Sequence, residues 1–320
     1  MSSEHCVQGF TADCAARVLP VPACDANKYS RGCLLVVGGS SSFKGAPVLA
    51  ALAAQRSGAG YVRLATVEAA AQTAQSCLLS ATVAACPDTN GFMNKEALPQ
   101  LEQLAAKAKA VAVGPGLGCS QTTSELLWAM LESDALRGLP WLMDADALNI
   151  VAADVFRFKE SRAGNPTVIT PHEGEAARLL GRKVHDRPKD AAALASACGC
   201  VAVLKGPDTL VAFPEGELRV VRSGGPELAK AGTGDVLAGV VGALLAQGLL
   251  PMDAACLGVY LHGAAGAAAA CEHSVLSTLP EDVIDSIAAA VRGLECANQE
   301  LRLAQDSAAA RALARVQGQG

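Results

Sequence analysis

The chain has 320 residues, of which 51% are apolar, only 3% are aromatic and 18% are charged, with a net charge of −5. This length is enough for one large or two ordinary domains with a substantial core. The charge argues against a nucleic-acid binder, because phosphate neutralisation needs a basic face and no Lys/Arg block occurs. The apolar content excludes disordered and collagen-like classes.

The cysteines favour a protein of the reducing cytosol, and the two long uncharged stretches favour buried helices over membrane spans. No Cys-x-x-Cys pair occurs among the 12 cysteines, so the thiols are predicted to be small core residues. Residues 1–13 contain no apolar run, which is unlike a signal peptide. Stretches 236–252 and 254–271 are rich in Ala and Gly and marginal in length for a membrane span, so they predict buried helices. We expect a cytoplasmic location, with no nucleic-acid or membrane partner.

From residue 33 onward, short apolar runs alternate with alanine-rich helical stretches such as 46–56, a pattern typical of a sheet covered by helices. The expected strands are 33–37, 61–66, 81–85, 110–113, 141–143, 167–170 and 201–204. Their uniformly apolar character predicts parallel pairing, with both faces of the sheet buried. Residues 210–213 and 218–222 flank a Pro-Glu-Gly turn and predict a hairpin at the sheet edge, after which three helices follow.

The domain organisation is simple, because no Pro/Ser-rich linker and no internal repeat divides the chain. We expect one α/β domain over residues 28–298. An N-terminal lead, 1–27, precedes it. A tail rich in Ala, Arg and Gln, 299–320, follows it and is expected to be partly mobile.

The strongest functional signal is a glycine-rich turn that leads directly into an apolar helix, at residues 231–239. Such a turn exposes unpaired backbone N–H groups where the helix dipole favours an anion, so Gly232, Thr233 and Gly234 are predicted to form an anion hole. Asp235 stands at the start of the helix. There the dipole is expected to keep its carboxylate ionised, able to act as a base or to hold a metal. A helix N-cap is the alternative role for Asp235.

Three other polar motifs follow predicted strands, at residues 144–149, 170–175 and 205–209. The carboxyl ends of strands are where α/β sheets bind ligands. Lys205 is thus placed for an anionic ligand, and His172 with its neighbouring carboxylates for polar contacts to a substrate. Each motif alone also fits a turn or a capped helix start.

Other candidate motifs are incomplete or ambiguous. The segment 114–118 begins like a dinucleotide fingerprint, but Cys119 stands at its third glycine position. A Walker motif is missing too, because Lys44 precedes rather than follows its glycine. His262 and His273 lie on the late alanine-rich helices and are read as core or surface residues.

Taken in chain order, these motifs resemble those of the ADP-dependent NAD(P)H-hydrate dehydratase family, which has the ribokinase-like fold. The resemblance covers about residues 28–295. Its motifs are Val36–Ser40, Lys44–Pro47, Gly58–Gly60, Gly114–Gly118, Asp144–Asp146, Thr170–His172, Lys205–Gly206 and Ala231–Asp235. It implies an α/β three-layer sandwich, in which helices cover both faces of a mostly parallel central sheet.

The same resemblance implies a carbon–oxygen lyase that repairs the S epimer of hydrated NADH or NADPH, with ADP as co-substrate, AMP and phosphate as products, and Mg²⁺ without an assigned protein ligand. It places four residues against the hydrated nucleotide: Ala46, Gly116, His172 and Asp235. It places six at the adenine nucleotide: Lys205, Gly206, Pro207, Asp208, Thr209 and Gly234. The chain departs from the family at Glu173, where proline is usual, and at Thr233, where serine is frequent.

The implied mechanism has Asp235 take the proton of the hydrate's hydroxyl while that hydroxyl attacks the terminal phosphate of ADP. Phosphate then leaves and the dihydropyridine ring is restored. A homotetramer is expected. A separate epimerase is expected as well, because the 27 leading residues are too few for a fused one. An ATP-dependent small-molecule kinase of the same superfamily and a non-catalytic nucleotide-binding regulator are the alternatives.

Overall fold

The computed structural model describes residues 7–317, with side-chain surroundings as far as residue 303. A ten-stranded sheet forms its centre, in the order β1-β12-β11-β10-β9-β8-β7-β2-β3-β4. The strands are β1 (Val7–Gly9), β2 (Cys33–Val37), β3 (Tyr61–Val67), β4 (Thr82–Cys86), β7 (Ala110–Val113), β8 (Trp141–Met143), β9 (Thr167–Ile169), β10 (Val201–Leu204), β11 (Thr209–Ala212) and β12 (Leu218–Val221). All seven predicted core strands are present, and they pair in parallel from β4 through β10.

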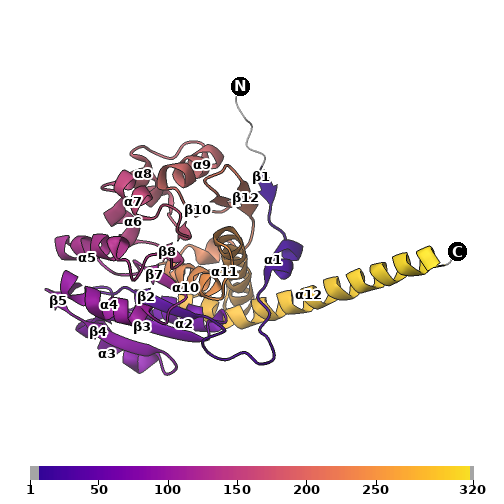
Figure 1. Ribbon diagram of the computed structural model, residues 1–320, viewed down its shortest axis with the longest axis horizontal. Helices are drawn as coiled ribbons and strands as arrows, with labels where there is room; N and C mark the ends of the chain where they lie inside the picture. Colours follow the sequence, from indigo (N-terminus) through magenta and orange to yellow (C-terminus); the bar gives the residue numbers. More distant parts are fainter. Residues whose placement is uncertain (1–6, 318–320) are drawn as a thin grey trace.

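Helices cover both faces of this sheet, as Figure 1 shows. One layer holds α1 (Ala12–Val18), α2 (Ala46–Arg56), α10 (Thr233–Ala246), α11 (Pro251–His273) and α12 (Pro280–Gln317). The other holds α4 (Leu98–Ala105), α5 (Gln121–Glu132), α6 (Asp146–Val151), α7 (Val155–Ser161), α8 (Glu173–Leu180) and α9 (Arg187–Cys198), while α3 (Glu68–Cys77) packs along β3 and β4. The expected three-layer α/β sandwich is confirmed.

The two faces of β2 explain why the strands read as unbroken apolar runs. Leu34 and Val36 belong to the core on the α10 side, whereas Leu35 and Val37 belong to the core on the α5 side. All four side chains are fully buried. A strand buried on both faces needs apolar residues at every position, so strict alternation is lost.

The predicted hairpin is present as β11 and β12, but its position at the sheet edge is wrong. β1 pairs in parallel with β12, Val7 opposite Leu218, and thus lies outside the hairpin. The three residues of β1 are exposed and too few for a periodic pattern, so the sequence carries no clear strand signal there. The next segment, α1, packs against α11 and α12.

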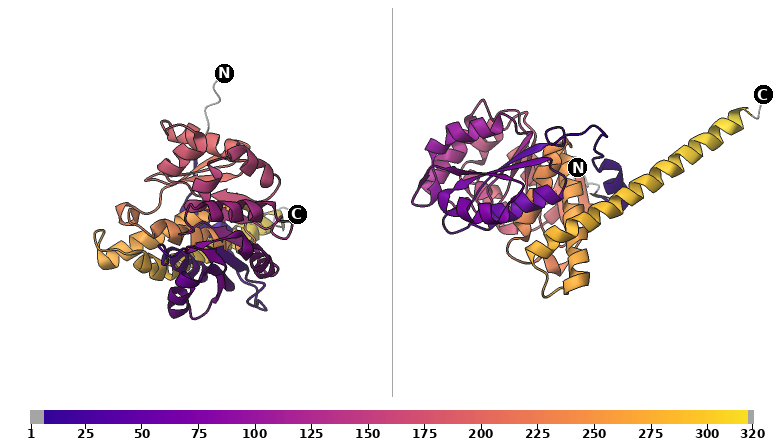
Figure 2. Two further views of the ribbon diagram at one scale, coloured as in Figure 1. Left: turned by 90° about the vertical axis from the view of Figure 1, so that its left-hand side faces the viewer. Right: turned by 90° about the horizontal axis from the view of Figure 1, so that it is seen from below.

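The helix α12 continues well beyond the body of the fold, as Figures 1 and 2 show. The predicted tail therefore begins inside a helix that runs to Gln317. Its mobility stays a prediction, and residues 318–320 lie outside the described part of the chain.

The long apolar helix α11 is a core element. Within residues 7–317 it is the one helix long and apolar enough to cross a membrane, yet 67% of its most apolar window is buried inside the fold. It packs between α10 and α12.

The cysteines are only partly the core residues that the sequence predicts. Cys33, Cys86, Cys198, Cys200 and Cys256 are buried, whereas five of the other described cysteines are exposed. No pair among the described cysteines forms a disulfide.

Candidate active site

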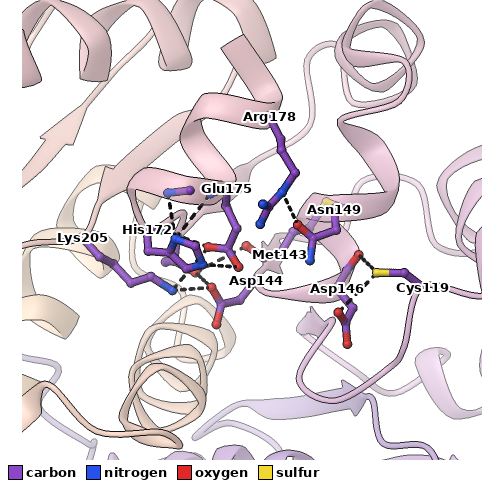
Figure 3. A network of polar contacts seen from close by, with 11 residues as sticks. Cys119, Met143, Asp144, Asp146, Asn149, His172, Glu175, Arg178 and Lys205 are labelled. Atoms are coloured by element: carbon purple, nitrogen blue, oxygen red, sulfur yellow. Dashed lines mark hydrogen bonds and ion pairs between the residues drawn. The ribbon is translucent and has the colours of Figure 1, made fainter. Parts of the chain in front are cut away.

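The loops that follow β8, β9 and β10 meet at the carboxyl edge of the sheet around one buried carboxylate. Asp144, which follows β8, is only 2% exposed. Its Oδ1 accepts hydrogen bonds from Lys205 Nζ at 2.9 Å and from Thr170 Oγ1 at 2.8 Å. Figure 3 shows Lys205 reaching toward Asp144 from the loop after β10. A buried charge is tolerated when it is paired and hydrogen-bonded in this way.

Lys205 is a fixed cation in this cluster. Its Nζ also lies 3.9 Å from Glu175 Oε2 on α8. Burial lowers the pKa of Lys205, but the carboxylates of Asp144, Glu175 and Asp235 outweigh it and raise the pKa above its ordinary value. Lys205 is thus charged at neutral pH.

The turn before α10, which is predicted to bind an anion, is held by close packing and by a hydrogen bond. Gly232 is the N-cap residue of α10 and has φ +97°, where a Cβ would lie 2.9 Å from both Leu49 Cδ1 and Pro280 Cγ. The Thr233 hydroxyl donates to the Leu228 carbonyl at 2.7 Å, which ties the turn to the preceding loop. Gly232 is therefore required for packing as well as for the left-handed backbone.

The N–H groups of this turn are not equivalent. Thr233 N–H donates to the Lys230 carbonyl at 3.4 Å, whereas those of Gly234 and Asp235 donate to no acceptor within residues 7–317. A methyl group at Gly234 would lie 3.6 Å from Lys205 Nζ and 3.9 Å from Asp144 Oδ2. The free N–H groups, the helix dipole and the Lys205 ammonium thus lie together, an arrangement suited to a phosphate group.

Asp235 differs both from the alternative role of a helix N-cap and from the expected full ionisation. It is not the N-cap of α10, because Gly232 occupies that position and Asp235 lies within the first turn. The dipole also does not keep it fully ionised, since burial raises its pKa to about 7, with a further rise from Asp144 and an opposing effect of Lys205. A carboxyl group with a pKa near neutrality is well suited to accept a proton in a reaction at neutral pH.

The residues assigned to the substrate by resemblance fall into two groups besides Asp235. Ala46 starts α2 and meets Gly116, where a Cβ would lie 3.1 Å from Ala46 Cβ and 2.8 Å from Phe43 Cβ. Gly116 also has φ +62°, so both the close contacts and the left-handed backbone favour glycine there. His172 lies instead beside Lys205 and Glu175.

His172 is the N-cap of α8. Its Nδ1 accepts hydrogen bonds from Gly174 N–H at 2.9 Å and Glu175 N–H at 3.4 Å, and its Nε2 lies 3.5 Å from Glu175 Oε1. Burial, followed by the charges of Lys205 and Arg178, lowers its pKa below the ordinary value. The imidazole is therefore neutral at neutral pH.

Glu173, which stands where proline is usual in the family, has an ion-pair partner in the structure. The Glu173 carboxylate pairs with Arg187 on α9. The Arg187 guanidinium also donates to the carbonyls of Leu204, Lys205 and Asp208, at 3.3, 3.3 and 3.1 Å. Glu173 thus supports the loop that carries Lys205. The sequence reasoning missed Arg187, which carries no motif.

A second polar network holds the glycine loop after β7. Asp146 Oδ2 accepts a hydrogen bond from Gly118 N–H at 2.8 Å, and the Cys119 thiol lies 3.3 Å from Asp146 Oδ1 (Figure 3). Burial and the Asp146 charge raise the pKa of Cys119 to about 11, so it remains a thiol. Asp144 and Asp146, paired in the sequence, thus support two different loops.

A pocket of about 480 Å³ opens beside Lys205 and Gly234. Seven of its lining residues come from the predicted motifs: Lys205, Gly206, Pro207, Thr209, Thr233, Gly234 and Leu237. Eight were missed: Ser223, Gly224, Gly225, Pro226, Leu228, Ala229, Val259 and His262. The Ser-Gly-Gly-Pro segment after a strand was a usable signal for a ligand-binding loop. Asp208, the remaining residue assigned to the adenine nucleotide, is not among these lining residues. Its carboxylate accepts a hydrogen bond from Arg222 at 3.1 Å.

The described residues contain no group of three or more His, Cys, Asp or Glu side chains that could hold a metal ion. Mg²⁺ commonly keeps several waters and binds through one or two carboxylates plus substrate phosphates. The site therefore fits a cation that arrives with a nucleotide, and provides no protein cage for it.

The fold is that of the ribokinase-like class of α/β proteins. A ribokinase-like superfamily protein from Enterococcus faecalis shares the fold, with a TM-score of 0.77 at 22% identity over 92% of this chain and 98% of that one. The sequence profile of the NAD(P)H-hydrate dehydratase family matches residues 34–289. The chain belongs to the NAD(P)H-hydrate dehydratase family.

Individual relatives agree with this assignment. The ADP-dependent (S)-NAD(P)H-hydrate dehydratase of Neisseria meningitidis is 40% identical over 75% of this chain and 78% of its own length. The bifunctional NAD(P)H-hydrate repair enzyme of Salinibacter ruber is 39% identical over 87% of this chain, which spans 51% of that relative. The ADP/ATP-dependent dehydratase of Bacillus subtilis, co-crystallised with ATP and Mg²⁺, has a TM-score of 0.75 at 29% identity over 91% of this chain and 99% of that one. The chain thus spans about half the length of its bifunctional relatives.

Proposed function

We propose that this protein dehydrates the S epimer of hydrated NADH or NADPH at the expense of ADP, releasing AMP and phosphate. One observation carries the proposal: the free N–H groups at the start of α10 and the Lys205 ammonium lie beside Asp235, whose pKa is raised to about 7. This arrangement supports a phosphate-binding site next to a carboxyl group suited to act as a base. The Neisseria relative, named for this activity, supports the same reaction.

The residues define a role for each part of the site. Asp235 takes the proton from the hydroxyl group of the hydrate as that oxygen bonds to the terminal phosphorus of ADP, and AMP leaves as the phosphorus–oxygen bond to it breaks. The N–H groups of Gly234 and Asp235 and the Lys205 ammonium stabilise the charge on the transferring group. Phosphate is a better leaving group than hydroxide, so the carbon–oxygen bond to it breaks, the adjacent ring carbon loses a proton to water, and the double bond of the dihydropyridine ring is restored.

The nucleotide would lie in the pocket beside α10. Its phosphates would face Lys205 and Gly234, and its base and ribose would extend toward the apolar lining formed by Leu228, Leu237 and Val259. Mg²⁺ would be held mainly by the nucleotide phosphates and water, where it would neutralise phosphate charge. Ala46 and Gly116 would contact the hydrated nicotinamide nucleotide, with His172 on the other side of the site.

A direct test is to incubate the protein with hydrated NADH, ADP and Mg²⁺ and to follow the absorbance of reduced nicotinamide at neutral pH. The proposal expects the absorbance to rise with the release of AMP and phosphate, and the Asp235→Asn protein is the matched control. Consumption of ATP with a simple alcohol, while hydrated NADH is ignored, would instead support the kinase of the same fold. Nucleotide binding without either turnover would support a regulator.

The assembly and location remain proposals of the same kind. We propose a symmetric oligomer, a tetramer, because large apolar side chains such as Leu79, Leu250 and Leu276 are 93%, 71% and 89% exposed. A cytoplasmic location and an epimerase on a separate polypeptide stay predictions. Longer relatives are named bifunctional NAD(P)H-hydrate repair enzymes.

A further inference from the structure

The nucleotide pocket has a buried histidine in its wall that the proposed reaction does not use. His262 lies on α11, is 8% exposed and lines the pocket together with Leu237 and Val259. Its Nε2 has no hydrogen-bond partner among the described residues. Each of its neighbours in the sequence, from Gly258 to Gly266, is apolar or small except Tyr260.

An unpartnered imidazole nitrogen is an unfavourable group in the interior of a protein. A buried polar atom without a hydrogen bond costs its full desolvation penalty, and an apolar side chain of similar size would avoid that penalty. Such atoms in native structures therefore call for an explanation, and an absent ligand is one. The position of His262 in a pocket wall favours this explanation, because the group that completes its hydrogen bonding can enter from the pocket.

The state of the imidazole limits the kind of partner. Burial lowers the pKa of His262 to about 4, against a hydrogen bond to the Thr233 backbone that raises it, and the charge of Lys205 lowers it further. The ring is therefore neutral at neutral pH and brings no positive charge to a phosphate group. A neutral ring nitrogen pairs with an uncharged hydroxyl or amino group.

The place of His262 in the pocket indicates which part of a nucleotide it meets. The phosphate end is formed by Lys205 and Gly234, whereas Leu228, Leu237 and Val259 form an apolar lining. Val259 is one helical turn from His262 on α11, so the imidazole is grouped with the apolar lining. An apolar lining with a single neutral polar group suits the uncharged part of a nucleotide.

We propose that His262 Nε2 hydrogen-bonds the nucleoside part of the bound nucleotide, through a ribose hydroxyl or the amino group of the base, and so contributes to selection of a nucleotide over a simple diphosphate. The inference rests on the proposed use of ADP. It adds a residue on α11, remote in sequence from the lysine and glycine motifs, to the nucleotide site.

The experiment measures the affinity of purified protein for ADP, AMP and inorganic pyrophosphate by calorimetry, with no turnover involved. His262→Leu is expected to weaken the binding of ADP and of AMP by about three- to tenfold, the range of one net hydrogen bond. Pyrophosphate affinity should not change, and thermal stability without ligand should be equal or higher, because a partnerless polar atom has been removed. The control is His273→Leu, on the last turn of the same helix, where the imidazole faces Asp282 at 3.5 Å.

Two further arms make the test decisive. His262→Gln keeps a hydrogen-bonding group and should restore part of the ADP affinity, which also guards against a leucine variant that fails to fold. In the wild-type protein, 2′-deoxy-ADP or inosine diphosphate should bind more weakly than ADP, and His262→Leu should abolish that difference for the analogue that lacks the contacted group. The analogue so affected identifies ribose or base as the partner.

Three results would overturn the proposal: unchanged ADP affinity in folded His262→Leu, an equal loss for ADP and pyrophosphate, or analogue differences that persist in the variant. The outcome is separable from that of the proposed function. Wild-type protein that binds ADP but leaves hydrated NADH unchanged would contradict the dehydratase reaction and leave the His262 contact in place. Wild-type protein that binds neither ADP nor ATP would contradict both.

Discussion

Lys205 Nζ lies 2.9 Å from Asp144 Oδ1, although 61 residues separate the two in the chain. The pair joins the ends of β8 and β10, on either side of β9, and Thr170 at the end of β9 donates to the same carboxylate oxygen. Asp144 therefore holds the ammonium group in front of the N-terminus of α10. The same carboxylate raises the pKa of Asp235, so one residue influences both the phosphate site and the proposed base.

Substitution of Asp144 should therefore change both properties together. In Asp144→Asn, Lys205 loses its closest negative partner, and we expect a higher KM for ADP. The pKa of Asp235 should fall, because a like charge is removed while the Lys205 charge remains, so the acid limb of the pH–rate profile should move to lower pH. Glu132→Gln is the control, since it removes an exposed carboxylate that pairs with Arg157 and belongs to neither the Lys205 nor the Asp235 surroundings. A lower rate with an unmoved acid limb would contradict this role.

The proposed base predicts the pH dependence of the wild-type enzyme. Asp235 accepts a proton only as the carboxylate, and its pKa is raised to about 7. We therefore expect kcat/KM for hydrated NADH to rise with pH through neutrality and to level off above it. Steady-state rates across this range would test the expectation, and a rate already at its plateau at mildly acidic pH would contradict it.

Replacement of the proposed base should lower turnover and leave ADP binding nearly unchanged. Asp235→Asn keeps the shape of the side chain but cannot take the hydroxyl proton, and general-base catalysis typically contributes about 10² to 10⁴ in rate, so turnover should fall by that order. ADP affinity should change little. Near-normal turnover in a folded variant would end the assignment of Asp235 as the base.

The same variant should not be less stable than the wild type. The folded-state pKa of Asp235, about 7, lies above the ordinary pKa of 3.8 for this group, so between these values the folded state holds a proton that the unfolded chain has released. The free energy of unfolding contributed by this group therefore falls as pH rises through that interval. Asparagine does not titrate, so Asp235→Asn should unfold at an equal or higher Tm at neutral and alkaline pH, as measured by thermal denaturation.

Gly234 offers a test of the phosphate site that leaves the fold intact. A methyl group there makes only ordinary contacts with Lys205 Nζ at 3.6 Å and Asp144 Oδ2 at 3.9 Å, and alanine favours a helix over glycine by up to about 1 kcal/mol. Gly234→Ala should thus keep its Tm but bind ADP more weakly, and the larger Gly234→Val should block the phosphate. Calorimetry would measure the loss, and unchanged ADP affinity would show that the phosphate lies elsewhere.

Gly232 is the matched contrast. It has φ +97°, and a Cβ there would lie 2.9 Å from Leu49 and Pro280 side-chain atoms. Gly232→Ala should therefore lower the Tm through strain and close contact, regardless of ligand.

The proposed oligomer is tested by mass. Light scattering at micromolar concentration should give a multiple of the 32.4 kDa chain, with four copies expected. A mass near one chain would contradict the oligomer.

Much of the fold was predictable because its signals are local. The central strands are buried on both faces, so runs such as Cys33–Val37 are apolar at every position and can be recognised without knowledge of their neighbours. β1 was not predictable, since three exposed residues become a strand only by pairing with β12. Its position outside the hairpin is a consequence of tertiary pairing.

The candidate site, like the fold, was only partly predictable from the sequence. The sequence alone determined which motifs follow the strands, the glycine-rich turn before Asp235, and the resemblance to a family that the comparisons confirm. Only the tertiary structure decided that Asp144 pairs with Lys205, that Glu173 pairs with Arg187 and that His262 lines the pocket. It also raised the pKa of Asp235 to about 7, so that the carboxyl group is only partly ionised at neutral pH, because a pKa depends on burial and on charges brought close by folding, whereas the sequence shows only the residue's place at the start of a helix.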